Sequence, residues 1–217
     1  MIINEIKDRY SDCKLCPNVL NHTKIFGHGK LNAKIAVCGE GPGKVEIERG
    51  EPFVGPAGVL LDQILLSVGI NREDVYFTNS VLCRTNEANR VPTKSECKNC
   101  RNRLFEELTI VNPKFTLLVG STALRTVMGE EYKIMEWHGK WITMLNRPCY
   151  FYFALLHPAW ILHSTTEEET RAKKKTMWTD IKNFHEDMTG FDEIIRDDVN
   201  EMARKDGLKI KDNPDIE

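Results

Sequence analysis

Two pairs of cysteines have the spacing C-x2-C, with which two thiolates can bind a single metal ion. They are Cys13 with Cys16 and Cys97 with Cys100. Because a structural zinc ion takes four ligands in a tetrahedron, the spacing alone favours a zinc site made by these four residues. The alternative is an iron–sulfur cluster, in which Cys83 replaces Cys97 as the fourth ligand.

A second group of residues suited to chemistry is rich in glycine and includes one amide and one imidazole. It consists of Gly39-Glu40-Gly41-Pro42-Gly43, Asn79, Gly120-Ser121 and His157-Pro158. Each member follows, or lies late in, a short apolar run. Ligands of an open parallel sheet bind outside the carboxyl ends of its strands, so we expect these residues to meet at one edge. The alternative for each residue taken singly is an ordinary loop position.

The elements that must position these residues are buried strands with helices between them. Short apolar runs rich in β-branched and aromatic residues predict four strands. They cover residues 34–38, 75–81, 115–119 and 150–156. Helical spacing of apolar residues predicts helices near residues 2–10, 60–68, 104–111 and 167–184. This alternation predicts an α/β fold with helices on both faces of a parallel sheet.

The charge is distributed unevenly along the chain. Thirty Lys and Arg against 32 Asp and Glu give a net charge of −2, which does not by itself indicate a nucleic-acid partner. From Phe191 onward there are nine acidic and five basic residues, so the remainder carries +2. We therefore expect one domain over residues 1–190 and a charged, net acidic C-terminal extension over residues 191–217.

The cysteine count and the absence of targeting patterns bear on the compartment. Seven thiols are an odd number, and no basic stretch followed by an apolar stretch resembles an export signal. A disulfide scaffold is therefore disfavoured, and we expect a reducing, cytoplasmic location. No run of ~18 apolar residues predicts a membrane span. Cys38 and Cys149 are interpreted as small core residues.

Taken together and in order, the motifs resemble those of the family 4 uracil-DNA glycosylases, the iron–sulfur branch of the uracil-DNA glycosylase superfamily. The resemblance extends over about residues 10–185. Each motif alone is weak, but the ordered set is specific. The matching residues are Cys13-x2-Cys16, Gly39-Glu40-Gly41-Pro42-Gly43, Glu46, Gly50, Pro52-Phe53-Val54-Gly55, Ala57-Gly58, Thr78-Asn79, Cys83-Arg84, Asn89-Arg90, Pro92, Cys100, Gly120, Ala123 and His157-Pro158-Ala159.

The resemblance implies a three-layer α/β/α fold with a central four-stranded parallel sheet and a 4Fe-4S cluster. The implied cluster ligands are Cys13, Cys16, Cys83 and Cys100. This set reverses the preference for zinc and makes the spacing of Cys97 accidental. The implied partner is DNA containing uracil, and the implied reaction is hydrolysis of the N-glycosidic bond of uracil to leave an abasic site. We expect a monomer that does not associate with membranes.

Two residues carry the implied recognition of the base. A glycosylase takes its target base out of the stack and recovers the cost in a tight pocket. Phe53 resembles the aromatic platform that covers the flipped pyrimidine. The amide of Asn79 can pair with N3–H and O4 of uracil, whereas cytosine would oppose an amino donor to the donor of Asn79.

The implied catalytic residues act on the leaving group and on the sugar. Cleavage leaves negative charge on the uracil ring, notably at O2, so a donor aimed at that oxygen lowers the barrier. His157 is the expected side-chain donor, with the backbone N–H of Gly41 as a second. Glu40 and Glu46 are the carboxylates nearby, and the sequence does not separate their roles in steering water, holding the pocket or stabilising the sugar cation.

Flipping also requires contacts with the DNA backbone and a wedge that fills the gap in the duplex. The basic candidates around the cluster loop are Arg84, Arg90, Lys94 and Lys98. Trp160 or Ile161 is the expected wedge, with inward packing of these residues as the competing interpretation.

Two further functions remain open at this point. The same fold can act on another deaminated or modified base, because pocket shape sets the choice. A catalytically weak, metal-stabilised DNA-binding module is the second alternative. The presence of both Phe53 and Asn79 favours uracil as the base.

Overall fold

The computed structural model describes residues 3–20, 22–86, 88, 90–143 and 151–205, with side chains described as far as residue 191. Six strands form one sheet. They are β1 (His28–Gly29), β2 (Ile35–Gly39), β3 (Val75–Asn79), β4 (Phe115–Val119), β5 (Trp141–Thr143) and β6 (Phe151–Leu155). The helices are α1 (Ile3–Ser11), α2 (Lys44–Arg49), α3 (Pro56–Leu66), α4 (Lys94–Val111), α5 (Gly120–Met128), α6 (Ile134–Trp137), α7 (Ala159–Leu162) and α8 (Glu167–Lys205), with a 3-10 turn at Arg72–Asp74.

The sheet has the strand order β1-β3-β2-β4-β6-β5. The inner strands β3, β2, β4 and β6 are parallel, while β1 and β5 pair antiparallel at the two edges. The expected four-stranded sheet therefore needs correction: the sheet is mixed and six-stranded. The two edge strands have only two and three residues, too short to carry a periodic hydrophobic signal.

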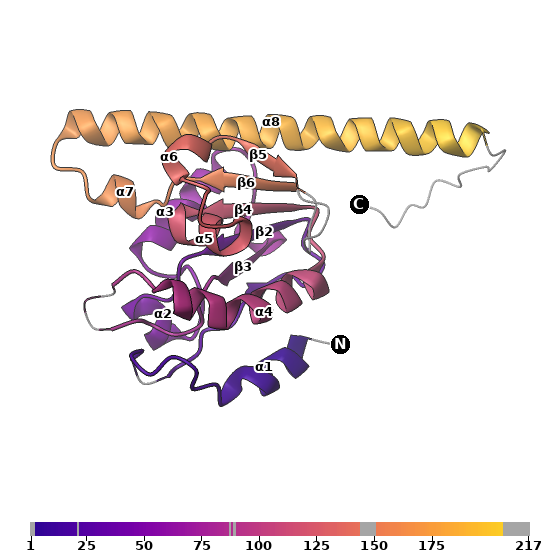
Figure 1. Cartoon of the computed structure of the whole chain (residues 1–217). Coiled ribbons are helices and arrows are strands. Elements are labelled where there is room, and N and C mark those ends of the chain that lie inside the picture. Colours follow the sequence, from indigo (N-terminus) through magenta and orange to yellow (C-terminus); the bar gives the residue numbers. More distant parts are fainter. Residues whose placement is uncertain (1–2, 21, 87, 89, 144–150, 206–217) are drawn as a thin grey trace.

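The inner strands are buried on both faces because each face packs against helices. Every residue of β2, β3 and β4 is buried. Alternate side chains enter different cores, so Val37 and Leu117 pack on the side of α3 and α8, and Ala36 and Leu118 pack on the side of α4 and α5. The result is three layers, helix–sheet–helix (Figure 1).

The expected core position of Cys38 is confirmed, since its side chain is fully buried in the second of these cores. Cys149 lies outside the described residues.

Helix boundaries follow local chemistry. At the start of α4, Oγ1 of Thr93 accepts from the backbone N–H of Glu96 at 3.2 Å, and the Glu96 carboxylate accepts from the N–H of Thr93 at 2.7 Å. This reciprocal cap satisfies donors that a helix start leaves unpaired. Pro56 occupies the first turn of α3, where its missing N–H costs nothing.

The last helix is longer than the sequence pattern predicted. Helix α8 spans 39 residues from Glu167. It runs past β5 and β6 at one edge of the sheet and continues beyond the sheet (Figure 1). It passes without a break through the expected boundary at residue 190. In the part of the chain that the structure describes, no helix is both long and apolar enough to cross a membrane.

Candidate active site

A cavity of about 310 Å³ lies outside the carboxyl ends of β2, β3 and β6. Its walls come from the glycine-rich turn after β2, from α2, from the turn before α3 and from the segment that follows β6. The six residues expected to bind and process the base all line it. They are Glu40, Gly41, Glu46, Phe53, Asn79 and His157.

Gly39 allows the side chains of Phe53 and Asn79, the two expected to recognise the base, to approach each other. A Cβ on Gly39 would lie 2.5 Å from Cζ of Phe53 and 2.6 Å from Oδ1 of Asn79, closer than real Cβ contacts allow. The ring of Phe53 also contacts Phe77, with 5.5 Å between ring centroids. Phe53 has φ +56°, a left-handed conformation that is uncommon for a bulky residue. The ring is thus held by the surrounding structure and not by local preference.

Arg72 holds the turn that carries Phe53. Its guanidinium donates to the backbone carbonyls of Pro52 at 2.9 Å and Phe53 at 3.1 Å. The same group pairs with the Asp62 carboxylate at 2.9 Å and lies 4.4 Å over the ring of Phe77. One cation therefore satisfies two carbonyls of a strained turn and anchors them to α3 and β3. No motif in the sequence marks Arg72, so its role emerges only from the tertiary structure.

Asn79 is the last residue of β3, and only 4% of it is exposed. Within the described residues its side-chain amide makes no hydrogen bond, so both the donor and the acceptor groups are available to a base. Its backbone carbonyl accepts from Arg103 at 2.7 Å. Arg103 pairs with Glu107 at 3.1 Å, and Glu107 in turn accepts from Thr78 at 2.6 Å.

Arg103 and Glu107 form a charged pair inside the core, with side-chain exposures of 0% and 1%. Buried charges persist only where partners satisfy them, and here the partners are the last residues of β3. The pair therefore fixes the backbone that presents Asn79. No local pattern distinguishes the two residues, because on α4 their spacing is that of an ordinary charged helix.

The Glu46 carboxylate joins two loops. Its Oε1 accepts from the N–H of Gly55 at 2.7 Å, and its Oε2 accepts from the N–H of Gly43 at 3.1 Å. A Cβ on Gly55 would lie 2.8 Å from Oε1. Both oxygens of Glu46 are therefore engaged in holding the glycine-rich turn against the turn before α3.

Glu40 has a different environment. Its Oε2 accepts from the Thr122 hydroxyl at 2.6 Å, whereas Oε1 accepts no hydrogen bond from any residue in the described ranges. Burial raises the pKa of Glu40, although the Thr122 hydrogen bond and the charge of Arg125 oppose that rise. Of the two carboxylates, Glu40 is the one with an oxygen available to a ligand.

His157 is oriented by the backbone. Its Nδ1 accepts from the N–H of Ala159 at 3.2 Å, so in the neutral ring the proton resides on Nε2, which becomes a donor. Burial lowers the pKa of His157, and the neighbouring His163 lowers it further. Gly120, at φ +87°, lies against the imidazole, and a Cβ there would be 3.1 Å from Cβ of His157. The neutral, donating ring is the form this packing favours.

The four cysteines of the expected cluster line a second cavity. Cys13 and Cys16 follow α1, Cys83 follows β3 and Cys100 lies on α4. Cys97 does not line this cavity and faces a groove between α4 and α5.

The thiols of this cavity are near enough to influence one another. Burial raises the pKa of Cys83 to about 12, and the charges of Cys100 and Cys16 add to the rise. Asn99 donates to Cys16 Sγ at 3.5 Å. Among the described residues, no three Cys, His, Asp or Glu side chains are gathered around a single ion site.

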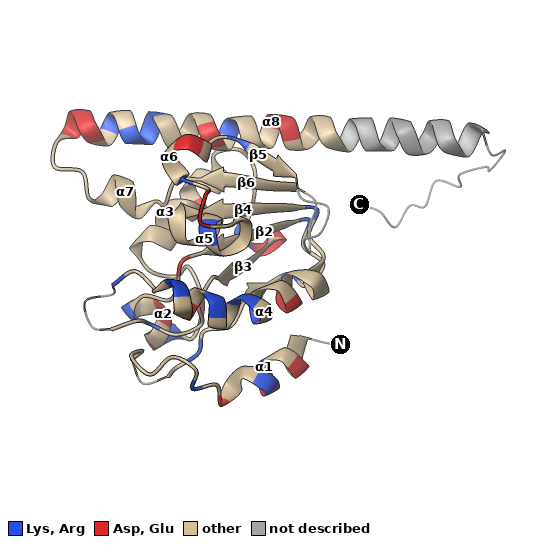
Figure 2. Ribbon diagram, in the orientation of Figure 1, with Lys and Arg blue, Asp and Glu red and all other residues tan. Residues whose placement is uncertain are grey.

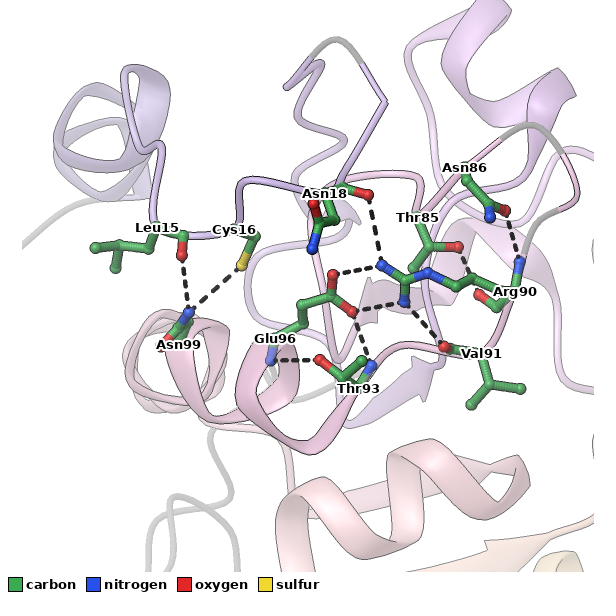
Figure 3. A network of polar contacts seen from close by, with 10 residues as sticks. All are labelled: Leu15, Cys16, Asn18, Thr85, Asn86, Arg90, Val91, Thr93, Glu96 and Asn99. Carbon is green, nitrogen blue, oxygen red and sulfur yellow. Dashed lines mark hydrogen bonds and ion pairs between the residues drawn. The ribbon is translucent and has the colours of Figure 1, made fainter.

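Arg90, an expected DNA contact, is engaged with the protein itself. It donates to both oxygens of Glu96, at 2.7 and 2.9 Å, and to the carbonyl of Asn18 at 3.4 Å (Figure 3). The hydrogen bond from Arg90 lowers the pKa of Glu96 to about 2. Arg90 thereby connects the loop after β3 to the cap of α4 and to the segment after Cys16.

The other expected DNA contacts differ in exposure. Arg84 is buried. Ile161 is also buried, within the core beside α3 and α8, while Trp160 is half-buried with Lys173 5.1 Å over its ring. Leu162, which was not among the expected DNA contacts, is the apolar residue of α7 that is 49% exposed.

Comparisons with known proteins agree with this geometry. The model of the uracil DNA glycosylase superfamily matches residues 26–182. A type-4 uracil-DNA glycosylase of Thermotoga maritima is 38% identical over 168 residues, which cover 76% of this chain and 86% of that protein. One of Archaeoglobus fulgidus is 33% identical over 178 residues, covering 74% and 83%. The chain therefore belongs to the uracil-DNA glycosylase superfamily and, within it, to the type-4 family.

Proposed function

We propose that this protein is a uracil-DNA glycosylase, which flips uracil out of DNA and hydrolyses its N-glycosidic bond in base excision repair. The observation that carries the proposal is the base pocket itself, where the amide of Asn79, the ring of Phe53 and the imidazole of His157 line one cavity. Family membership supports the same reaction.

Recognition of uracil rests on Asn79 and Phe53. The amide oxygen accepts from N3–H of uracil while the amide nitrogen donates to O4. Cytosine presents an amino group where uracil has O4, so two donors would face each other in a buried site at a cost of about 1–3 kcal/mol. The ring of Phe53, fixed by Gly39 and Arg72, covers the face of the base.

Catalysis rests on the leaving group. As the bond between N1 and the sugar breaks, its electron pair moves into the uracil ring, and Nε2–H of His157 donates to O2 together with the N–H of Gly41. A water molecule then bonds to the sugar carbon, and the proton that it loses neutralises the departing uracil anion, so the products are uracil and the abasic sugar. Glu40 is the carboxylate that orients this water and stabilises the sugar cation, because its Oε1 is available. Glu46 holds the pocket closed around the base.

We assign the 4Fe-4S cluster to Cys13, Cys16, Cys83 and Cys100, since these four line one cavity and Cys97 does not. When bound, the cluster crosslinks the segment after α1, the loop after β3 and helix α4. Cys100 is three residues from Arg103, so the same helix supports the cluster and the backbone of Asn79.

The wedge that enters the duplex is Leu162. It is exposed on α7, five residues after His157, whereas Ile161 is committed to the core. An apolar side chain in this place fills the gap that the flipped nucleotide leaves.

The function is tested by alkaline cleavage of labelled oligonucleotides that carry one uracil opposite G, opposite A or unpaired. We expect strand breaks at uracil, and a loss of about 10²–10³-fold in rate for His157→Ala. His28→Ala, which removes an exposed histidine of the edge strand β1, serves as the matched control. No breaks at uracil from a folded, DNA-binding protein would contradict the proposal and favour another base or a binding module.

A further inference from the structure

A groove of about 280 Å³ lies between the first two turns of α4 and the helix α5. Its walls carry the cations Lys94, Lys98, Arg101 and Arg125 and the carboxylate Glu130. Four positive charges against one negative charge make the groove attractive to anions. Figure 2 shows Lys and Arg along the first half of α4 and on α5.

The two arginines are oriented by backbone groups. Arg101 donates to the carbonyl of Val127 at 3.2 Å, and Arg125 donates through Nε to the carbonyl of Ser121 at 3.3 Å. Carbonyl contacts orient a guanidinium and leave its charge in place. Among the described residues Arg125 uses only Nε for a hydrogen bond, so its terminal N–H groups form a fork that matches a phosphate.

The one carboxylate of the groove does not block an incoming anion. Lys94 pairs with Glu130 at 3.1 Å, but the two side chains are 79% and 50% exposed. An exposed pair of this kind contributes about 0–1 kcal/mol, so a phosphate can replace Glu130 as the partner of Lys94.

Two smaller hollows that share lining residues lie between the groove and the base pocket. A hollow lined by Pro92, Thr122 and Arg125 adjoins the groove. Pro92 also lines a small cleft together with Glu40 and Gly41, which themselves line the base pocket. Helix α4 begins on the side of the molecule where α2 and α7 lie (Figure 1).

We propose that the groove between α4 and α5 binds the phosphate backbone of the DNA strand that carries the flipped base. This inference rests on the proposed function for the identity of the strand. A DNA strand carries one charge per nucleotide, so a backbone leading away from the pocket presents successive phosphates to the basic groove. The contact is independent of sequence, because phosphates position the protein without reading bases.

The test is the salt dependence of binding to undamaged duplex and single-stranded DNA by the full protein. In the double variant Lys94→Ala/Lys98→Ala, we expect the slope of log K against log salt to fall by about 0.7–0.9 for each lysine, with affinity reduced uniformly across sequences. Both lysines are exposed, so the fold is retained.

Lys182→Ala is the matched control. Lys182 is exposed on α8, in the opposite helical layer, and it too loses an exposed ion pair, with Glu186. We expect this variant to bind like the unmodified protein. Equal slopes for the double variant and Lys182→Ala would overturn the proposal. This binding experiment uses DNA without uracil, so its outcome does not depend on catalysis. A protein that fails to excise uracil would contradict the proposed function, but its salt dependence would still test the groove.

Discussion

The guanidinium of Arg103 donates to the backbone carbonyl of Asn79 at 2.7 Å, and through this contact helix α4 supports the residue that we propose to read the base. The same guanidinium reaches the carbonyl of Ser80 at 3.3 Å. Since Cys100 lies on the same helix, three residues before Arg103, the base pocket and the cysteine cavity are braced by one element.

Replacement of Arg103 is expected to damage stability and base recognition together. In Arg103→Met the Glu107 carboxylate stays buried without its partner, which costs about 3–5 kcal/mol of unfolding free energy. The double variant Arg103→Met/Glu107→Met removes both charges and should recover much of that loss. Urea unfolding measures the stability of both proteins.

The double variant also separates stability from positioning. It should remain folded while its KM for uracil-containing DNA rises, because the backbone of Asn79 has lost its donor. A folded double variant with unchanged KM and unchanged discrimination between uracil and cytosine would show that Arg103 contributes only to stability and does not position Asn79.

The two possible cysteine sets make opposite predictions for Cys97. Cys97→Ser should retain the visible absorption of an iron–sulfur cluster and four iron atoms per chain, whereas Cys100→Ser should lose both. Cys97 and Cys100 lie on the same helix three residues apart, so each is a control for the other. Zinc bound in both the unmodified protein and Cys83→Ser, but absent in Cys97→Ser, would establish the other set.

Glu46 should act through the two loops that it joins. Glu46→Gln replaces one acceptor oxygen by an amide NH2, a donor that faces the backbone N–H of Gly43 or Gly55, and a hydrogen bond to a charged group is worth about 1.5–3 kcal/mol. We expect lower thermal stability and a higher KM. Glu48→Gln, on the exposed part of the same helix, should change neither quantity. Equal thermal stability and equal KM in the two variants would show that Glu46 does not hold the two loops together.

His157 should make stability depend on pH in a defined direction. Its pKa is lower in the folded protein than the ordinary value of about 6.5, so between these two values the unfolded chain binds the extra proton. The contribution of His157 to stability is therefore complete above about pH 6.5 and is lost as the pH falls through the folded pKa. The difference in unfolding free energy between the unmodified protein and His157→Gln, measured from pH 8 to 5, isolates this effect. If the unmodified protein became more stable relative to His157→Gln on acidification, the lowered pKa of His157 would be contradicted.

Gly39→Ala tests how tightly the pocket is built. Its Cβ would lie within 2.6 Å of both Phe53 and Asn79, so at least one of them must move. We expect uracil excision to fall by more than tenfold while the cluster absorption stays unchanged. Gly50→Ala meets no neighbouring atom within 4 Å and controls for the loss of a glycine, although its positive φ adds a strain of about 1 kcal/mol. Full activity in Gly39→Ala would show that the pocket is adaptable.

Local patterns were sufficient for the elements and for much of the site. The apolar runs before Gly39, Asn79 and His157 predicted buried parallel strands, and the polar residues at their ends line one pocket because parallel strands end at one edge. The edge strands β1 and β5 escaped prediction since two or three residues carry no periodicity. The full length of α8 was not predicted either, because apolar spacing marks only the part of a helix that packs against the core.

The sequence by itself determined which chemical groups are available, namely the cysteines, the glycine-rich turn, the amide of Asn79 and the imidazole of His157. Only the tertiary structure decided which of these groups are engaged and which are available to a ligand. Both oxygens of Glu46 accept hydrogen bonds, one oxygen of Glu40 does not, and Cys97 lies outside the cysteine cavity. The physical reason is that these outcomes depend on hydrogen bonds and burial between segments distant in sequence, such as the contact of Arg103 with Asn79, and no local pattern records such contacts.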